Sequence, residues 1–135
     1  MHTSNFRKVK RVEDVIHVFC KISEKIPAKL LMIGDGPERQ NAEKLVRSLC
    51  DKMDVRFLGK QEAVEELLAI ADVFLLPSES ESFGLSALEA MACEVPVVSS
   101  NAGGIPEVNI DGETGFLLNV GDVQGMANRC LELLQ

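Results

Sequence analysis

Apolar residues along the chain recur at two different spacings. Val12, Val15, Ile16, Phe19 and Ile22 are three or four positions apart, which is the spacing of one face of an amphipathic helix. This pattern predicts a helix from about residue 10 to residue 25. The same reasoning predicts helices at about 37–50, 62–71 and 85–93, a helical turn near 107–108 and a closing helix from about 123.

Short continuous apolar runs, which are typical of buried strands, separate the helical segments. Residues 1–5 resemble the end of a strand, and further strands are predicted at 29–33, 55–59, 73–76, 96–99 and 116–118. Strands that are apolar on both faces and alternate with amphipathic helices indicate a parallel sheet covered on both sides. The predicted fold is an α/β, Rossmann-like doubly wound parallel sheet that forms one domain over residues 1–135.

The overall charge excludes one class of ligand. The chain carries a net charge of −7 and contains six Phe but no Trp or Tyr. Nucleic-acid binding depends on basic surfaces, and single strands also need aromatic platforms, so neither function is expected. One stretch departs from the acidic average, because Arg7, Lys8, Lys10 and Arg11 lie within five positions. Such a cluster is either solvated or meets an anion.

The cysteines and histidines do not predict a metal centre or a disulfide framework. His2 and His17 are isolated, and no Cys-x-x-Cys pair occurs. We expect the cysteines to be small buried hydrophobic side chains in a reducing cytoplasm. They are Cys20, Cys50, Cys93 and Cys130.

The two ends of the sequence lie inside predicted elements, so we expect the chain to be part of a longer protein. No apolar run reaches the roughly 18 residues that a membrane span needs, and no signal peptide is visible. A cytoplasmic location is the corresponding expectation.

The densest chemical signal lies at residues 77–92, where a buried strand ends, a polar loop follows and Gly84 precedes a helix. The first amides of a helix have no partner inside the helix and carry the positive end of its dipole, so an anion such as a pyrophosphate can bind there. Glu81 lies in the loop and Glu89 one to two turns into the helix. A carboxylate at Glu89 is suited to accept hydrogen bonds from vicinal ribose hydroxyls.

The run Pro-Ser-x-x-Glu-x-Phe-Gly-Leu-x-x-x-Glu-Ala-Met-Ala resembles the signature of the retaining GT-B glycosyltransferases of group 1. In this chain it spans residues 77–92 and contains Glu81 and Glu89. Other segments resemble the same family in order, so that the likeness covers nearly the whole chain. They are residues 33–37, 55–59, 95–98, 103–107 and 112–118.

The resemblance implies a UDP-sugar as donor and assigns roles to residues at matching positions. Lys10 and Glu81 would be catalytic, with Lys10 neutralising the diphosphate leaving group and Glu81 holding hydroxyls of the transferred sugar. The donor-binding residues implied are Asn5, Leu58, Gly59, Phe83, Gly84, Leu85, Ser86 and Glu89. The segment 58–61 would frame the base, the first amides of the helix would hold the phosphates, and Glu89 would bind the ribose.

One position departs from the family pattern. Many relatives have an arginine five residues before the matching lysine, where this chain has Asn5, and Arg7 is expected to replace it as a third catalytic residue. The run from Ser4 to Arg11 resembles the subfamily that joins N-acetylglucosamine to L-malate in bacillithiol synthesis. That resemblance implies UDP-N-acetylglucosamine as donor and L-malate as acceptor.

The family also implies how the chain would work. Transfer would retain the configuration of the anomeric carbon and would need no cofactor or metal, in agreement with the lack of an Asp-x-Asp motif. The missing N-terminal domain of the same enzyme would supply most of the acceptor site, so the isolated domain is expected to bind UDP without catalysing transfer. Two alternatives stay open: a UDP-sugar epimerase of GT-B type, and a non-catalytic α/β interaction domain.

Overall fold

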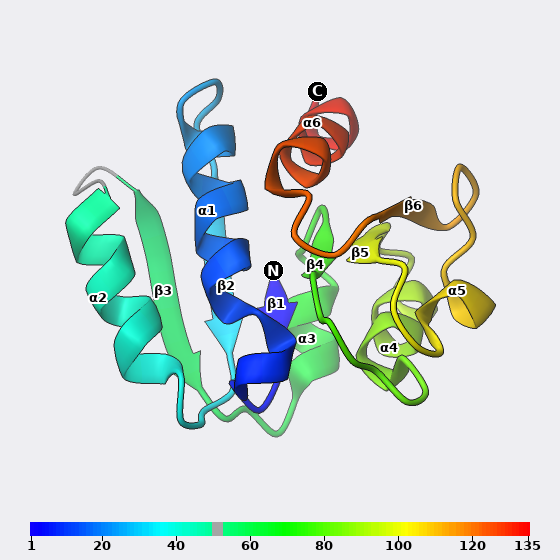
Figure 1. Cartoon of the computed structure of the whole chain (residues 1–135), viewed down its shortest axis with the longest axis horizontal. Helices are drawn as coiled ribbons and strands as arrows, with labels where there is room; N and C mark the ends of the chain where they lie inside the picture. Colours follow the sequence, from blue (N-terminus) through cyan, green and yellow to red (C-terminus); the bar gives the residue numbers. More distant parts are fainter. Residues whose placement is uncertain (50–52) are drawn as a thin grey trace.

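Short parallel strands alternate with helices along the chain. The computed structural model describes residues 1–49 and 53–135 (Figure 1). The strands are β1 (His2–Thr3), β2 (Lys29–Ile33), β3 (Asp54–Gly59), β4 (Phe74–Leu76), β5 (Val97–Ser100) and β6 (Gly115–Leu118). The helices are the 3-10 helix η1 (Lys8–Lys10) and α1 (Val12–Ser23), α2 (Arg39–Leu49), α3 (Val64–Leu68), α4 (Leu85–Ala92), α5 (Ile105–Val108) and α6 (Val123–Leu134).

The strands form two parallel groups of three that meet at β1 and β4. The first group has the order β1-β2-β3 and the second the order β4-β5-β6. The amide of Leu75 in β4 donates a 2.9 Å hydrogen bond to the carbonyl oxygen of Met1, immediately before β1. The order across the molecule is therefore β3-β2-β1-β4-β5-β6, with a topological switch point between β1 and β4. This is the Rossmann-like, doubly wound arrangement predicted from the sequence.

Alternate side chains of the strands enter two hydrophobic clusters on opposite faces. Leu30 and Met32 of β2 pack with α1 and α6, whereas Leu31 and Ile33 belong to the cluster that contains residues of α3 and α4. This alternation follows from the strand period of two, and it explains why the strands read as continuous apolar runs. Both faces of the sheet are therefore covered, as expected.

Two of the predicted helices differ from the observed ones. The helix predicted at 62–71 is limited to α3, because residues 67–71 tighten into turns in which Ile70 and Ala71 donate to carbonyls only three positions back. On α2 the apolar face is only partly covered, since this helix lies at the edge of the sheet. Ala42 is buried there, but Leu49 is 38% exposed.

The cysteines are less uniformly buried than predicted. Cys130 is buried in the cluster beneath α6, and burial raises the pKa of its thiol to about 12. Cys20 and Cys93 are only half-buried, because each packs against the margin of a hydrophobic cluster and not inside it. Cys50 lies outside the described residues.

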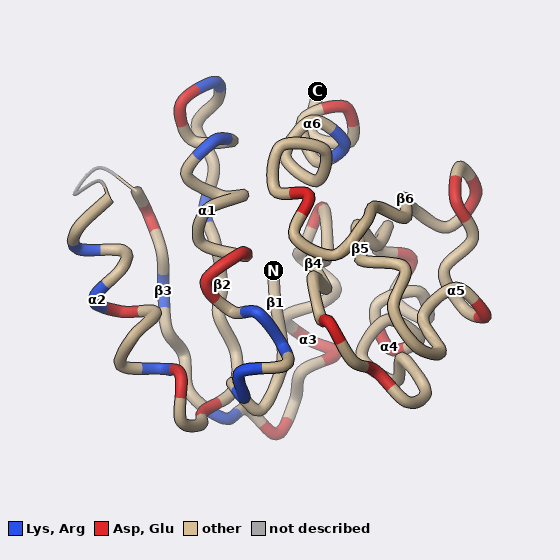
Figure 2. The backbone as a smooth tube through the Cα atoms, in the orientation of Figure 1, with Lys and Arg blue, Asp and Glu red and all other residues tan. Residues whose placement is uncertain are grey.

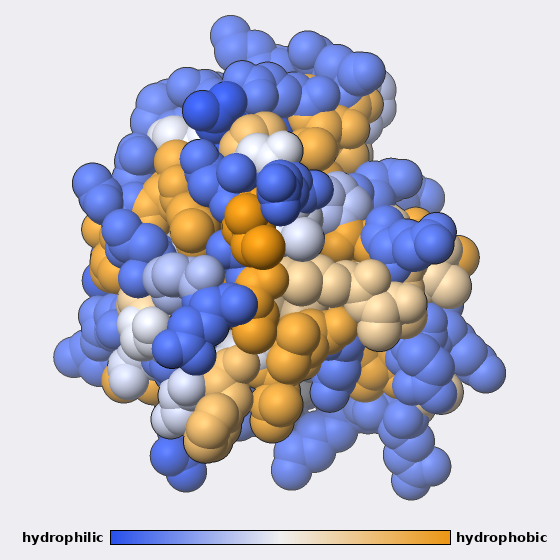
Figure 3. Space-filling model, turned by 90° about the vertical axis from the view of Figure 1, so that its right-hand side faces the viewer, coloured by the Kyte–Doolittle hydropathy of each residue, from blue (hydrophilic) through white to orange (hydrophobic). Residues whose placement is uncertain are grey.

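Some large apolar side chains reach the surface. Phe83 is 72% exposed, Leu85 63% and Ile110 48%. The face on the side of α5 shows hydrophobic areas between hydrophilic ones (Figure 3). None of the helices in the described ranges is both long and apolar enough to span a bilayer.

Candidate functional site

A cleft lies at the carboxyl ends of β1 and β4, beside the switch point of the sheet. Its volume is about 470 Å³. One wall comes from the residues around the end of β1 and from η1, and the other from the loop after β4 and the start of α4. The lining residues are Thr3, Ser4, Asn5, Lys10, Ser80, Glu81, Ser82, Phe83, Gly84, Leu85, Ser86 and Glu89.

The start of α4 has the geometry of an anion site. Gly84 is the N-cap residue with φ of 64°, a left-handed conformation that glycine adopts without strain. A Cβ at this position would also lie only 3.0 Å from Cγ2 of Val108. In the described part of the chain, no side chain accepts a hydrogen bond at this cap. The positive end of the helix therefore faces the cleft without a built-in side-chain acceptor.

An ion pair connects the two walls of the cleft. The Lys10 ammonium donates a 2.7 Å hydrogen bond to Oε1 of Glu81, and the side chains are 19% and 11% exposed. The Ser78 hydroxyl donates to the same carboxylate oxygen at 3.1 Å. Figure 2 shows the basic stretch before α1 beside the acidic stretch that follows β4. A cation and a carboxylate thus meet directly in front of the helix start.

A second ion-pair group fastens the loop after β4 to the start of α1. Arg11 donates to Asp14 at 2.6 Å and to Glu79 at 3.2 Å, and the bond to Asp14 is the main cause of a raised Arg11 pKa. The amide of Glu79 also donates to the carbonyl oxygen of Val9 at 2.9 Å. Both acidic residues of the loop are therefore paired with the basic stretch, which holds the loop close to η1.

The loop after β5 is hydrogen-bonded to the loop after β4, which forms one wall of the cleft. The amide of Gly104 donates to the carbonyl oxygen of Glu81 at 2.8 Å, and the Ser100 hydroxyl donates to the carbonyl oxygen of Ser78. A Cβ on Gly103, whose φ is 53°, would overlap the Glu81 carbonyl oxygen. The Gly-Gly pair is thus needed for the close approach of these two backbones.

Strand β1 contains a buried residue that the sequence reasoning missed. His2 is fully buried, and burial lowers its pKa to about 4. Its ring lies 2.8 Å from the carbonyl oxygen of Leu75 and 2.9 Å from the Ser4 hydroxyl oxygen. Thr3, on the same strand, has a buried hydroxyl oxygen with no hydrogen-bond partner in the described part of the chain. A polar residue at an inward strand position was the available signal for His2.

Comparison with known proteins identifies the family. The family described as Glycosyl transferases group 1 matches residues 1–135. The chain belongs to this family. Over its full length it is 54% identical to N-acetyl-alpha-D-glucosaminyl L-malate synthase of Bacillus anthracis, of which it covers 35%. It is 40% identical over 129 residues to sulfoquinovosyl transferase SQD2 of Arabidopsis thaliana and covers 24% of that protein. The chain thus spans about a third or less of these relatives.

Solved structures show the same architecture. A TarM mutant of S. aureus, crystallised with Fondaparinux, alpha-GlcNAc-glycerol and UDP, superposes with a TM-score of 0.94 over 98% of this chain and 27% of its own. The identity there is 24%, so the likeness concerns the fold alone. Anabaena HepE in complex with UDP and glucose is 27% identical, with a TM-score of 0.85 over 99% of this chain and 38% of its own. The fold is that of GT-B glycosyltransferases.

Most of the residues predicted for a group 1 glycosyltransferase converge on the cleft. Of the predicted site residues, the structure brings eight into the lining: Asn5, Lys10, Glu81, Phe83, Gly84, Leu85, Ser86 and Glu89. Arg7 is exposed and lies outside the lining, at the N-cap of η1. Leu58 and Gly59 end β3, two strands away from β1, and also lie outside it. The assigned roles stay predictions.

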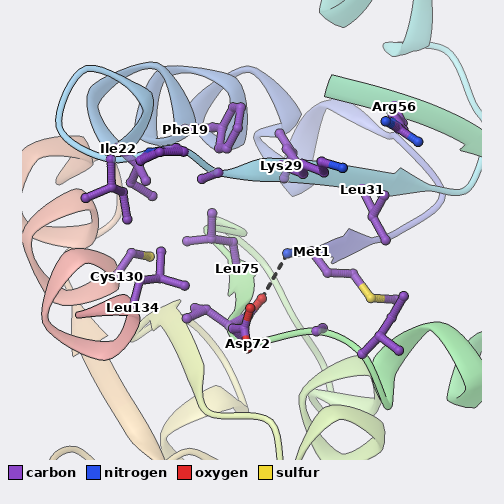
Figure 4. Close-up of a pocket in the computed structure, with 17 residues that line it drawn as sticks. Met1, Phe19, Ile22, Lys29, Leu31, Arg56, Asp72, Leu75, Cys130 and Leu134 are labelled. Carbon is purple, nitrogen blue, oxygen red and sulfur yellow. Dashed lines mark hydrogen bonds between the residues drawn. The ribbon is translucent and has the colours of Figure 1, made fainter. Parts of the chain in front are cut away.

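A second hollow lies at the opposite end of the sheet (Figure 4). Its volume is about 560 Å³, and it is lined by residues at the amino ends of β2 and β4 and at the ends of α1 and α6. Ligands of doubly wound folds bind at the carboxyl ends of the strands, so the cleft at Lys10 is the candidate site of this glycosyltransferase-family chain. Among the described residues, no three His, Cys, Asp or Glu side chains are grouped as metal ligands.

Proposed function

We propose that this chain holds the UDP part of a UDP-sugar for retaining glycosyl transfer. The observation that carries the proposal is the start of α4, which lacks a side-chain cap in the described structure and lines the same cleft as Lys10 and Glu81. Helix amides and an ammonium group together suit a diphosphate, whose charge they neutralise without rearranging.

Each wall of the cleft has a proposed task. The amides of Gly84, Leu85 and Ser86 bind the phosphates, and Lys10 stabilises the departing diphosphate. Glu81 accepts hydrogen bonds from sugar hydroxyls, while Glu89 accepts them from the ribose. The positions of the two carboxylates support this division, since Glu81 lies beside Lys10 and Glu89 lies farther along α4.

The proposed donor is UDP-N-acetylglucosamine and the proposed acceptor is L-malate, as in bacillithiol synthesis in the cytoplasm. Two observations support this choice: the full-length identity of 54% to the B. anthracis synthase, and the Ser4-Asn5-Phe6-Arg7 run at the cleft. We propose Arg7 as a second cation for the diphosphate. In the structure its side chain is exposed and lies outside the cleft lining.

The proposed reaction needs no metal, because Lys10 and the α4 amides supply the charge stabilisation. We further propose that a second domain, lying outside these residues in the longer protein, carries most of the acceptor contacts. The 135-residue chain alone is then expected to bind UDP and to show no transfer.

Calorimetric titration of the chain with UDP tests the proposal. Binding is expected in the wild type, and Glu89→Ala is expected to weaken it about tenfold or more, since hydrogen bonds to a carboxylate contribute about 1.5–3 kcal/mol. Glu66→Ala is the matched control, because Glu66 is an exposed helical carboxylate outside the cleft lining. Absence of UDP binding in the wild type, or equal binding in Glu89→Ala, would refute the site assignment.

A further inference from the structure

The buried ring of His2 lies between β4 and the cleft. Nδ1 is 2.8 Å from the Leu75 carbonyl oxygen, and Nε2 is 2.9 Å from Oγ of Ser4. A carbonyl oxygen only accepts hydrogen bonds, so Nδ1 carries the proton in the neutral ring. Nε2 then accepts from the Ser4 hydroxyl. Every polar atom of the neutral ring is thereby satisfied, which a buried imidazole requires.

The Ser4 hydroxyl connects the His2 ring to the cleft wall by hydrogen bonds. Its oxygen accepts a 3.2 Å hydrogen bond from the amide of Phe6. Phe6 has φ of 49°, a left-handed conformation that is unfavourable for an aromatic residue. The bond from Phe6 to Ser4 closes a tight bend with Asn5 at its exposed tip, and both Ser4 and Asn5 line the cleft. The hydroxyl therefore stabilises a strained bend that shapes the ligand site.

The other side of the bend is fixed by backbone packing. A Cβ on Gly34 would overlap the Ser4 carbonyl oxygen, and a Cβ on Gly36 would overlap that of Asn5. The turn between β2 and α2 thus presses against the bend, while His2 holds it from the sheet. The bend is therefore held on one side by the turn between β2 and α2 and on the other by the hydrogen bonds that link it to His2.

The surroundings of the ring favour its neutral form. The rings of Phe6 and Phe74 stack near it, with centroids 6.2 and 6.4 Å away. Burial is the largest cause that lowers the His2 pKa to about 4, and the positive charges of the Met1 amine and Lys10 add to it. Within the described part of the chain, these two are the charged groups that act on the ring. A protonated ring would direct a second N–H at Ser4 and force the hydroxyl hydrogen away from Nε2.

We propose that His2 is a positioning residue for the cleft, whose neutral Nδ1–H ring orients the Ser4 hydroxyl and thereby holds the bend at Asn5 in its ligand-binding form. This inference rests on the proposed UDP site and adds a residue to it. His2 touches no ligand atom in this mechanism and acts only through Ser4.

UDP titration of the 135-residue chain at neutral pH tests the connection. Ser4→Ala removes the hydroxyl and is expected to weaken UDP binding about tenfold while the amide spectrum away from residues 2–6 stays that of the folded wild type. Ser4→Thr keeps a hydroxyl and should restore most of the affinity. Ser23→Ala is the matched control, since it removes a hydroxyl that bonds to a backbone carbonyl but lies on α1 away from the cleft.

Nitrogen-15 spectra of the histidine rings give a readout that does not depend on a variant's folding. The expected result is the Nδ1–H tautomer for His2, with ring signals that shift when UDP is added to the wild type. An Nε2–H tautomer, ring signals that ignore UDP, or wild-type affinity in Ser4→Ala would each overturn this inference alone. Failure of the wild type to bind UDP would instead overturn the proposed function and this inference with it.

Discussion

The ion pair between Lys10 and Glu81 leads to a specific expectation: removing the charge of a carboxylate from the cleft should strengthen UDP binding. Glu81 pairs, at a separation of 2.7 Å, with the ammonium group that we propose as a diphosphate contact. Glu81→Gln keeps the shape and the hydrogen-bonding capacity of the side chain but removes its charge. The diphosphate then no longer competes with a carboxylate for Lys10, nor does it approach a negative charge.

The magnitude follows from the burial of the pair. Exposed ion pairs contribute about 0–1 kcal/mol, whereas breaking a buried pair costs about 3–5 kcal/mol. With side chains 19% and 11% exposed, the Lys10–Glu81 pair lies between these limits, nearer the exposed one because the cleft is open to water. We therefore expect about 1–2 kcal/mol, which corresponds to UDP binding that is tighter by roughly 5- to 30-fold.

Calorimetric titration with two ligands checks the reasoning. UDP should bind Glu81→Gln more tightly than wild type, whereas UDP-N-acetylglucosamine should gain less, because its sugar hydroxyls lose a charged acceptor. Glu79→Gln is the matched control: it makes the same change in the same loop, at a side chain that is 43% exposed and paired with Arg11 instead. If Glu81→Gln bound UDP as wild type does, or more weakly, the ion pair would not compete with the diphosphate.

Three further outcomes are expected. Lys10→Ala should weaken UDP binding in this chain, measured by calorimetry, and should raise the barrier to transfer in the complete enzyme by about 2.7–4 kcal/mol, measured by kinetics. Lys8→Ala, at an exposed lysine of the same short helix, should change neither quantity. Gly103→Ala should lower the free energy of unfolding, measured in urea, by more than Gly112→Ala does. Both glycines have positive φ, so an alanine costs about 1–2 kcal/mol at either position, but only an alanine at position 103 would also overlap a backbone carbonyl oxygen. The pKa of His2 is lowered from 6.5 to about 4, so the unfolded chain takes up the proton at a higher pH than the folded chain does. The free energy of unfolding should therefore drop by about 3 kcal/mol between pH 6.5 and pH 4. Should His2→Gln lose stability over this pH range as steeply as wild type, the buried His2 ring would not be the cause of the drop.

The sequence pattern alone predicted the bounds of an element correctly where proline or glycine residues lie at its ends. The strand at 29–33 lies between Pro27 and Gly34, and its prediction matches β2 residue for residue. The start of α4 at Gly84 was likewise predictable, because a buried strand, a polar loop and a glycine precede an apolar helix. The 62–71 segment has no glycine or proline to mark where its helix ends, so the sequence pattern does not separate α3 from the turns that follow it.

The candidate site was harder to derive because it depends on which strands are neighbours. Lys10 and Glu81 are 71 positions apart, and they meet only because β1 lies beside β4. Sequence spacing could relate Glu81 to Glu89 along one loop and helix, but it gave no partner for Lys10. His2 was dismissed as isolated for the same reason, since its partners are the carbonyl oxygen of Leu75 on β4 and the hydroxyl of Ser4.

The packing of α1 against α6 has a consequence for how the protein is made. The two helices come from opposite ends of the sequence and share one hydrophobic cluster, which joins Val15 and Val18 to Met126 and Cys130. During translation, the part of the apolar side of α1 that packs against α6 therefore stays uncovered until α6 has been synthesised. Such long-range closure slows folding and exposes partly made chains to aggregation. A nascent polypeptide stalled before residue 123 should accordingly be held by chaperones that bind apolar segments, and released only when α6 is complete.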